Sequence, residues 1–374
     1  MRINIVTGAF FSVPPAPCGA VEWVWYLLGK ELASRGHHVT ILARHAAVPL
    51  DCATTNLTII RKGGFSQTNR IWIDLGKDLL YSIDQMLRLP PADFTITNAF
   101  WLPPVLRIRP SAGRIVPSIN RYPKKQMGLY SHSCFLAACS TAIANAIKDQ
   151  SPRVRHLVRL IPNVIDTTAF TPPMTERDYA GTKTLLYTGR IHPEKGIHVL
   201  VDAFAMACKV RSDLRLKVVG PWTTSRGGGG EEYLNTLRSR TAGLPVEFCE
   251  PISGRDELAT LCRSAHFYCY PSLAAKGEAL PVAPIEAMAT GLIPIVSDLA
   301  CFDDYVTPET GVRFDYKNDP IGNLAQALLT LIASPQRCKE LSEAAAKRAA
   351  AFGPSAVAQL LETQMLLAVN AVKG

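Results

Sequence analysis

Short apolar runs alternate with longer amphipathic stretches along the whole chain. The runs have the length and continuous apolar character of strands buried on both faces of a parallel sheet. We expect these strands at Arg2–Thr7, His38–Ala43, Phe94–Thr97, Arg114–Ile119, Leu136–Cys139, His156–Ile161, Thr184–Tyr187, Arg215–Val219, Val246–Cys249, Phe267–Tyr270 and Leu292–Val296. We expect helices at Ala20–Arg35, Ile71–Leu89, Thr141–Lys148, Ile197–Cys208, Glu231–Arg240, Asp256–Ser264, Asn318–Ala333, Gln336–Ala351 and Ser355–Val372. This alternation predicts an α/β fold with parallel sheets.

The pattern divides the chain into two halves. A length of 374 residues exceeds one ordinary domain, so two are expected. A segment rich in proline and threonine, which includes Pro162 and Pro172–Pro173, is typical of a domain boundary. We therefore predict an N-terminal Rossmann-like domain over residues 1–163, a second over 164–353, and a C-terminal helix over 354–374 that returns to the first domain.

The overall composition narrows the class of protein. No uncharged apolar run reaches the roughly 18 residues that a membrane-spanning helix needs, and the first residues form a strand and turn rather than a signal peptide. A cytoplasmic location is expected, either free or peripheral at the inner membrane face. The ten cysteines form no C-x-x-C pair and the histidines no H-E-x-x-H motif, which favours reduced thiols and predicts no metal or other cofactor.

Positive charge is concentrated in the first half. The net charge is +9, and residues 1–165 hold 19 Lys and Arg against 8 Asp and Glu. This excess indicates an anionic partner, such as a membrane surface, a lipid-linked phosphate acceptor or an acidic polymer. The alternative is a basic surface that only keeps the protein soluble. No nucleic-acid motif accompanies the charge, so no nucleic-acid partner is predicted.

Candidate chemistry begins in the stretch Tyr268–Asp298, which has the pattern of strand, loop, helix and strand. Glu278 and Glu286 lie eight positions apart, one before the expected helix and one inside it. A helix N-terminus offers backbone N–H groups and a partial positive charge that suit a diphosphate. The two carboxylates would then hold hydroxyl groups on either side. The alternative is a solvated loop residue and an ordinary first-turn charge.

A second candidate lies in the loop Gly189–Gly196. Arg190 and Lys195 stand five positions apart there, ahead of the expected helix Ile197–Cys208. A guanidinium offers a fork of donors and an ammonium a point charge, so the two can converge on one anion. The alternative is a pair of unrelated surface charges.

These two segments together resemble the donor site of the retaining glycosyltransferases with the GT-B fold, the large family 4-like group. The Glu-x7-Glu spacing, the helix that carries Glu286 and ends at Gly291, and the G-R-x4-K-G segment all match. The resemblance implies two Rossmann-like domains that face each other across a cleft. It also implies transfer of a hexose from a UDP- or GDP-linked sugar to a hydroxyl of a glycan, a lipid-linked or a small-molecule acceptor, as in polysaccharide biosynthesis, without a metal.

The same resemblance assigns roles to residues of this chain. The expected catalytic residues are Arg190, Lys195 and Glu278. The expected donor-binding residues are Gly19, Ile252, Ala279, Leu280, Pro281 and Glu286. Asn98 stands near the place where many relatives have a histidine, and Ala279 replaces a usual glycine.

Further acceptor-side candidates come from a basic, aromatic loop that contains Asn120 and Arg121, although an ordinary solvated loop is the alternative. Asp303 lies in a stretch that replaces a Gly-Gly-x-x-Glu pattern of many relatives. The departures at Ala279, Asn98 and Asp303 keep open a nucleotide-sugar-binding protein without turnover. A separate alternative is a sugar-nucleotide epimerase or phosphorylase on the same fold.

Overall fold

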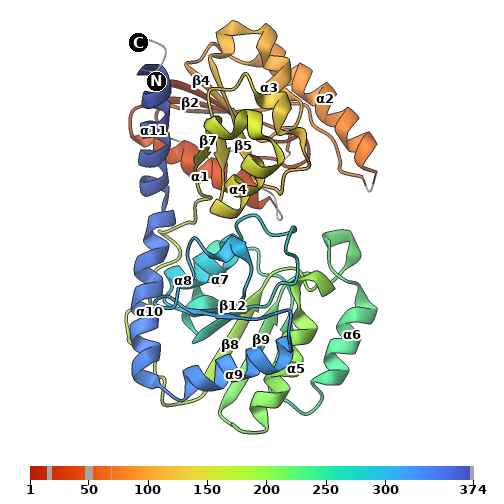
Figure 1. The fold of residues 1–374 in the computed structure, drawn as a ribbon, viewed down its shortest axis with the longest axis vertical. Helices are drawn as coiled ribbons and strands as arrows, with labels where there is room; N and C mark the ends of the chain where they lie inside the picture. Colours follow the sequence, from red (N-terminus) through yellow and green to blue (C-terminus); the bar gives the residue numbers. More distant parts are fainter. Residues whose placement is uncertain (15–18, 47–53, 69, 371–374) are drawn as a thin grey trace. The chain divides into compact units, whose positions relative to one another are not determined.

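The computed structural model describes residues 1–374 except 15–18, 47–53, 69 and 371–374. The chain forms two compact units (Figure 1). Unit 1 comprises residues 1–165 and 353–374, and unit 2 comprises residues 166–352. Cys18 and Cys52 lie outside the described residues. None of the cysteines that are described forms a disulfide.

Unit 1 is built on a seven-stranded sheet in the order β3-β2-β1-β4-β5-β6-β7. Its paired strands are parallel. They are β1 (Arg2–Val6), β2 (His38–Ala43), β3 (Leu57–Arg61), β4 (Phe94–Thr97), β5 (Arg114–Ile119), β6 (Leu136–Ala138) and β7 (Val158–Leu160). The edge strand β3 was not anticipated from the sequence.

The helices of unit 1 include one from the far end of the chain. They are α1 (Ala20–Ser34), α2 (Ile71–Arg88), α3 (Leu102–Val105), α4 (Thr141–Gln150) and α11 (Pro354–Asn370). Helix α11 packs against α1, and its Leu361 and Met365 are part of the same buried core as Val24. A polar contact supports this packing, since Glu362 accepts hydrogen bonds from Arg35 at 2.9 and 2.7 Å.

Unit 2 is built on a six-stranded parallel sheet in the order β10-β9-β8-β11-β12-β13. Its strands are β8 (Lys183–Thr188), β9 (Leu214–Val219), β10 (Val246–Cys249), β11 (Phe267–Tyr270), β12 (Ile293–Ser297) and β13 (Val312–Phe314). Its helices are α5 (Ile197–Cys208), α6 (Glu231–Arg240), α7 (Arg255–Arg263), α8 (Val282–Ala289), α9 (Pro320–Ile332) and α10 (Pro335–Ala349). The central strands β8 and β11 are adjacent, so the loops that follow them begin side by side.

No helix in the part of the chain that the structure describes is long and apolar enough to cross a membrane.

Candidate functional site

A glycine brings together the loops that follow β8 and β11. Gly196 has a φ of +70°, and a Cβ atom there would lie 1.9 Å from the carbonyl oxygen of Pro271. Any other residue would therefore push the two loops apart, since side chains rarely adopt this backbone conformation and Pro271 presents rigid backbone. The close approach places Lys195, in the one-turn 3-10 helix Pro193–Lys195, over the end of β11.

Lys195 and Glu278 form a buried ion pair. The Lys195 Nζ lies 2.5 Å from the Glu278 Oε1, and the side chains are 10% and 6% exposed. Taking two charges out of water is costly, and a close pair with further hydrogen bonds is the arrangement that offsets this cost. The sequence predicted both residues as site residues, and the structure places them in direct contact.

Two residues that sequence reasoning missed hold this pair. Tyr270, at the end of β11, lies 3.1 Å from the Lys195 Nζ through its hydroxyl, and the Nζ also stands 5.4 Å from the ring centroid. Ser272 donates a 2.7 Å hydrogen bond to the Glu278 Oε1. The two bonds to Glu278 thus end on one oxygen, and its Oε2 has no hydrogen-bond partner among the described residues. The sequence does hold one signal that Ser272 belongs to the site, because Ser272 lies just past the carboxyl end of a buried strand, where parallel sheets bind ligands.

Arg190 lies at the entrance of the same loop but contacts other groups. Its side chain is 42% exposed and pairs with Glu194 at 2.6 Å. The guanidinium also donates to the Gly227 carbonyl oxygen at 2.7 Å. The glycine-rich loop Gly227–Gly230 is therefore packed against the Arg190 loop. The convergence of Arg190 and Lys195 on one anion stays a prediction.

Glu286 lies one turn inside α8 and is buried. Its Oε1 lies 2.6 Å from the Nη2 of Arg255, in α7. The Arg255 guanidinium in turn stands 4.9 Å from the ring centroid of Phe170. Burial raises the pKa of the Glu286 carboxyl, and the charge of Arg255 opposes that rise. Arg255 was not predicted, because it lies 31 positions away on another helix.

The remaining donor-side candidates of unit 2 line the approach to α8 and the exit of β10. Pro281 is the residue that precedes α8, and its carbonyl oxygen accepts a 3.1 Å hydrogen bond from the Tyr305 hydroxyl. Leu280 is buried, and Ala279 is partly buried. Ile252 is partly buried between β10 and α7. Their contacts with a donor stay a prediction.

The other predicted residues belong to unit 1. Gly19 is buried at the start of α1, where its carbonyl oxygen accepts from Trp23 N at 3.0 Å. Asn98 follows β4, and its buried Oδ1 has no hydrogen-bond partner within the described part of the chain. Asn120 donates to the Ser118 hydroxyl at 2.7 Å, and Arg121 is exposed. Their assignment to the acceptor or donor stays a prediction.

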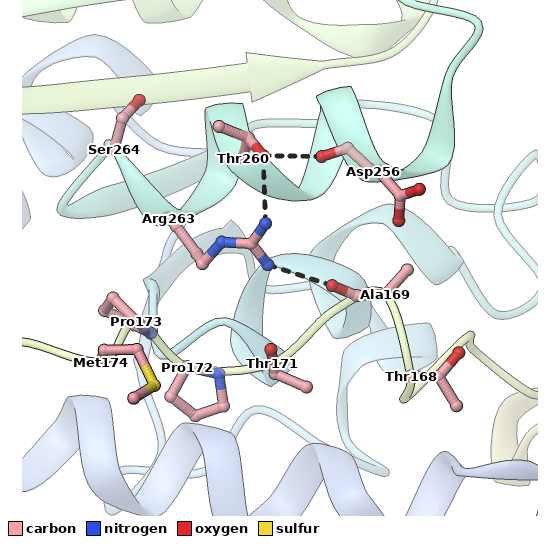
Figure 2. A pocket seen from close by; sticks show the side chains of 10 residues that line it. All are labelled: Thr168, Ala169, Thr171, Pro172, Pro173, Met174, Asp256, Thr260, Arg263 and Ser264. Atoms are coloured by element: carbon pink, nitrogen blue, oxygen red, sulfur yellow. Dashed lines mark hydrogen bonds between the residues drawn. The ribbon is translucent and has the colours of Figure 1, made fainter.

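A surface hollow of unit 2 lies elsewhere (Figure 2). It has a volume of about 700 Å³. It is lined by Thr168, Ala169, Thr171, Pro172, Pro173, Met174, Asp256, Thr260, Arg263 and Ser264. The Arg263 guanidinium donates to the Ala169 carbonyl oxygen at 3.1 Å and to Thr260 at 3.0 Å. None of the predicted site residues lines this hollow.

No cluster of three or more His, Cys, Asp or Glu side chains that could hold a metal ion occurs among the residues that the structure describes. The charged groups of the site instead form three pairs of a cation and a carboxylate. The Arg190–Glu194 pair is exposed, and the carboxylates of the Lys195–Glu278 and Arg255–Glu286 pairs are buried.

Comparison with known proteins finds a family model that matches part of the chain. The model of the glycosyl transferases group 1 family matches residues 176–348, which include the Lys195–Glu278 pair. This segment of the chain, somewhat less than half of its length, is thus similar to the glycosyl transferases group 1 family. The segment covers nearly all of unit 2, so the similarity lies in the half of the chain that contains both glutamates and the G-R-x4-K-G segment.

A curated relative and two solved structures are also similar to the chain. The chain is 29% identical over 188 residues to a GDP-mannose-dependent alpha-(1-6)-phosphatidylinositol dimannoside mannosyltransferase of Mycobacterium tuberculosis, which is 50% of this chain and 45% of the relative. The chain thus spans less than half of that relative's length in the match. Sucrose-phosphate synthase from Thermosynechococcus elongatus aligns with a TM-score of 0.78 and 20% identity over 99% of both chains. Anabaena HepE, in complex with UDP and glucose, aligns with a TM-score of 0.71 and 16% identity over 97% and 98% of the two chains. These structures confirm the expected GT-B fold class.

Proposed function

We propose that this chain is a retaining glycosyltransferase that moves a hexose from a nucleotide sugar to a hydroxyl group. The observation that carries the proposal is the buried Lys195–Glu278 pair beside the N-terminal end of α8. An ammonium, a carboxylate and helix N–H groups in one place suit a sugar linked to a diphosphate. The match of residues 176–348 to the glycosyl transferases group 1 model supports the same reaction class.

Two kinds of donor are supported by the similar proteins. The mycobacterial relative is named as GDP-mannose-dependent, and its acceptor is a phosphatidylinositol dimannoside. The HepE structure holds UDP and glucose. We therefore propose a GDP- or UDP-linked hexose as donor, and a lipid-linked or glycan hydroxyl as acceptor.

Catalysis in this proposal is mainly charge stabilisation. The bond between the anomeric carbon and the diphosphate oxygen breaks, and negative charge grows on the leaving diphosphate. Lys195, Arg190 and the N-terminal end of α8 stabilise that charge where it develops. The acceptor oxygen bonds to the anomeric carbon on the face from which the diphosphate departs, and its proton passes to a phosphate oxygen.

Glu278 has a separate role in the proposal. Its Oε1 is held by Lys195 and Ser272, which fixes the carboxylate plane. Its Oε2 can then accept hydrogen bonds from sugar hydroxyl groups and stabilise positive charge on the sugar ring as the bond breaks. Ser272 and Tyr270 act as positioning residues for the pair.

The test begins with nucleotide binding. Thermal unfolding is measured with UDP, GDP and ADP, since a ligand that binds the folded state raises apparent stability by mass action. The nucleotide that gives the largest shift defines the nucleotide sugars to assay. Release of the nucleoside diphosphate and the anomeric configuration of the product are then measured with candidate acceptors.

Each outcome of this test bears on the proposal. Release of nucleoside diphosphate with a retained α-linkage supports it. Binding without release with any acceptor or water supports the binding-protein alternative instead. A reaction that requires free phosphate supports a phosphorylase, and conversion of the donor into another sugar nucleotide supports an epimerase.

A further inference from the structure

Arg255 is the first residue of α7, and its side chain reaches across to α8. Its Nη2 lies 2.6 Å from the Oε1 of Glu286, and the two side chains are 29% and 8% exposed. The guanidinium also stands 4.9 Å from the ring centroid of Phe170. Guanidinium groups are attracted to aromatic faces, so this second contact restrains Arg255. A restrained arginine can in turn hold the Glu286 carboxylate in one orientation.

The Glu286 carboxylate uses only part of its capacity to accept hydrogen bonds. The bond from Arg255 ends on Oε1, and Oε2 has no hydrogen-bond partner among the described residues. Burial raises the pKa of the Glu286 carboxyl, and the charge of Arg255 opposes that rise. Arg255 therefore favours the ionised carboxylate, whose oxygens only accept hydrogen bonds. A buried acceptor of this kind is costly unless a ligand supplies the missing donor.

The place of Glu286 along α8 indicates which donor groups it receives. In the proposed function, the leaving diphosphate lies by Lys195 and the N-terminal end of α8, and Glu278 holds hydroxyl groups of the hexose. Glu286 lies eight positions past Glu278, inside the helix. A nucleotide sugar carries its pentose on the other side of the diphosphate from the hexose. The neighbouring 2′ and 3′ hydroxyl groups of a ribose are the donors that suit this carboxylate.

We propose that Arg255 is a positioning residue that fixes the Glu286 carboxylate and thereby makes the donor site selective for a ribose over a deoxyribose nucleotide. This inference rests on the proposed function and adds a residue that sets the pentose specificity of the same site. A site that hydrogen-bonds a substrate hydroxyl rejects the analogue without it, because a buried polar group is then left unpaired. When Arg255 is absent, the carboxylate can turn or take up a proton, and the discrimination is lost.

The experiment compares the binding of ribonucleoside and 2′-deoxyribonucleoside diphosphates to the full chain. Dissociation constants are measured by calorimetry for UDP against dUDP and for GDP against dGDP. We expect the wild type to bind the ribonucleotide about tenfold or more tightly, which is the size of one hydrogen bond to a charged group. Arg255→Met should reduce this preference to about twofold or less, chiefly by weakening the ribonucleotide.

A matched arginine lies on the same helix. Arg263 donates to the Ala169 carbonyl oxygen at 3.1 Å and to Thr260 at 3.0 Å (Figure 2). Among the described residues, its hydrogen bonds thus go to the segment beside Phe170 and to its own helix rather than to Glu286. Arg263→Met should leave the ribose preference unchanged. An equal fall in this variant would mean that the preference depends only on the packing of α7, and it would overturn the proposal.

A double-variant cycle separates an effect through Glu286 from a general loss of structure. Glu286→Gln alone should lower the ribose preference about as much as Arg255→Met, and the two substitutions together should lower it little further. Thermal unfolding without nucleotide reports the structural contribution of each variant separately. Arg255→Lys keeps the charge beside Glu286 and guards against misfolding of the methionine variant. Its preference should fall by about threefold, because an ammonium does not reproduce the planar guanidinium.

The outcomes distinguish this inference from the proposed function. If the wild type binds neither the ribonucleotide nor the deoxyribonucleotide, the proposed function fails and the inference fails with it. The inference alone is overturned if the wild type binds both nucleotides equally, or if both Arg255 variants keep the wild-type preference. It is also overturned if the effects of Arg255→Met and Glu286→Gln on the preference add.

Discussion

Two buried lysines stand near opposite ends of β8 in unit 2, and each is paired with a carboxylate. Lys183 begins the strand and lies 2.7 Å from the Asp213 Oδ2, with its side chain 2% exposed. Lys195 lies past the strand's carboxyl end and is 2.5 Å from the Glu278 Oε1. The local chemistry is the same, yet only the second pair stands at the edge of the sheet where parallel α/β folds bind ligands.

The surroundings of the two pairs differ in a way that explains their roles. Asp213 also accepts two hydrogen bonds from Arg211, at 2.9 and 2.6 Å, so both of its oxygens are occupied. Both bonds to Glu278 end on Oε1. In the Lys183–Asp213 pair the protein itself occupies both carboxylate oxygens, whereas the Lys195–Glu278 pair keeps one carboxylate oxygen for a ligand. A buried ion pair is weak evidence of a site unless its geometry leaves such capacity.

The largest expected effect is on turnover. Lys195→Met should lower the rate of nucleoside diphosphate release by about a hundredfold or more, because a preorganised donor to the leaving group is lost. Lys183→Met removes an equally buried ammonium from the other end of β8 and should leave the rate per folded molecule unchanged. Steady-state assays of both variants check this. Equal losses in the two variants would mean that only stability connects Lys195 with activity.

The next effect is on stability. Lys195→Met leaves the buried Glu278 carboxylate without its cation and should cost about 3 kcal/mol. Lys183→Met should cost about 1 kcal/mol, because Asp213 is 28% exposed and keeps Arg211. Combining Lys195→Met with Glu278→Gln should recover much of the loss. Urea unfolding of the three variants and the wild type measures these differences, and a double variant as unstable as Lys195→Met would refute the explanation.

A smaller effect is expected at the positioning residue Ser272. Ser272→Ala removes the 2.7 Å bond to Glu278 and should lower kcat by about tenfold, the size of one hydrogen bond to a charged group. Because Ser272 does not contact the nucleotide in this account, KM should change little. Ser272→Thr keeps the hydroxyl and should restore most of the rate. A rise in KM at constant kcat would instead give Ser272 a role in ground-state binding.

The smallest expected effect is the pH dependence of the stability that the Lys183–Asp213 pair contributes. Hydrogen bonds from Arg211 and then Lys183 hold the pKa of Asp213 below its ordinary value of 3.8. A depressed carboxyl pKa gives stability that is present above the ordinary value and is lost as pH falls through the folded one. The difference in unfolding free energy between wild type and Asp213→Asn should be about 1 kcal/mol at neutral pH and shrink below about pH 4. A difference that grew in acid would contradict this.

Much of the fold and of the candidate donor site could be predicted from the sequence, because both depend on patterns among residues close together in the chain. The spacing of Arg190 and Lys195 in a loop that ends at Gly196 predicted both as site residues. The spacing of Glu278 and Glu286 around one helix predicted both carboxylates. The parallel α/β fold followed from continuous apolar runs between amphipathic stretches. The strands β3 and β13 were missed, because both lie at sheet edges and neither is a fully buried run.

The parts that were missed depend on residues far apart in the chain. Arg255 reaches Glu286 from another helix, and the outward direction of the apolar side of α2 depends on buried partners such as Trp101 for Asp78. An amphipathic pattern identifies the helix but not the surface that covers its apolar side. Tyr270 was predicted only as the end of a strand and Ser272 only as part of the loop after it, because Lys195 reaches Tyr270 from 75 positions away in the chain.

The most direct test of the central claim is a structure of the chain with a bound nucleoside diphosphate or nucleotide sugar. The account predicts a phosphate oxygen within hydrogen-bond distance of the Lys195 Nζ, and a sugar hydroxyl within that distance of the Glu278 Oε2. A diphosphate bound elsewhere, for example in the hollow beside α7, with Lys195 and Glu278 unchanged, would contradict it.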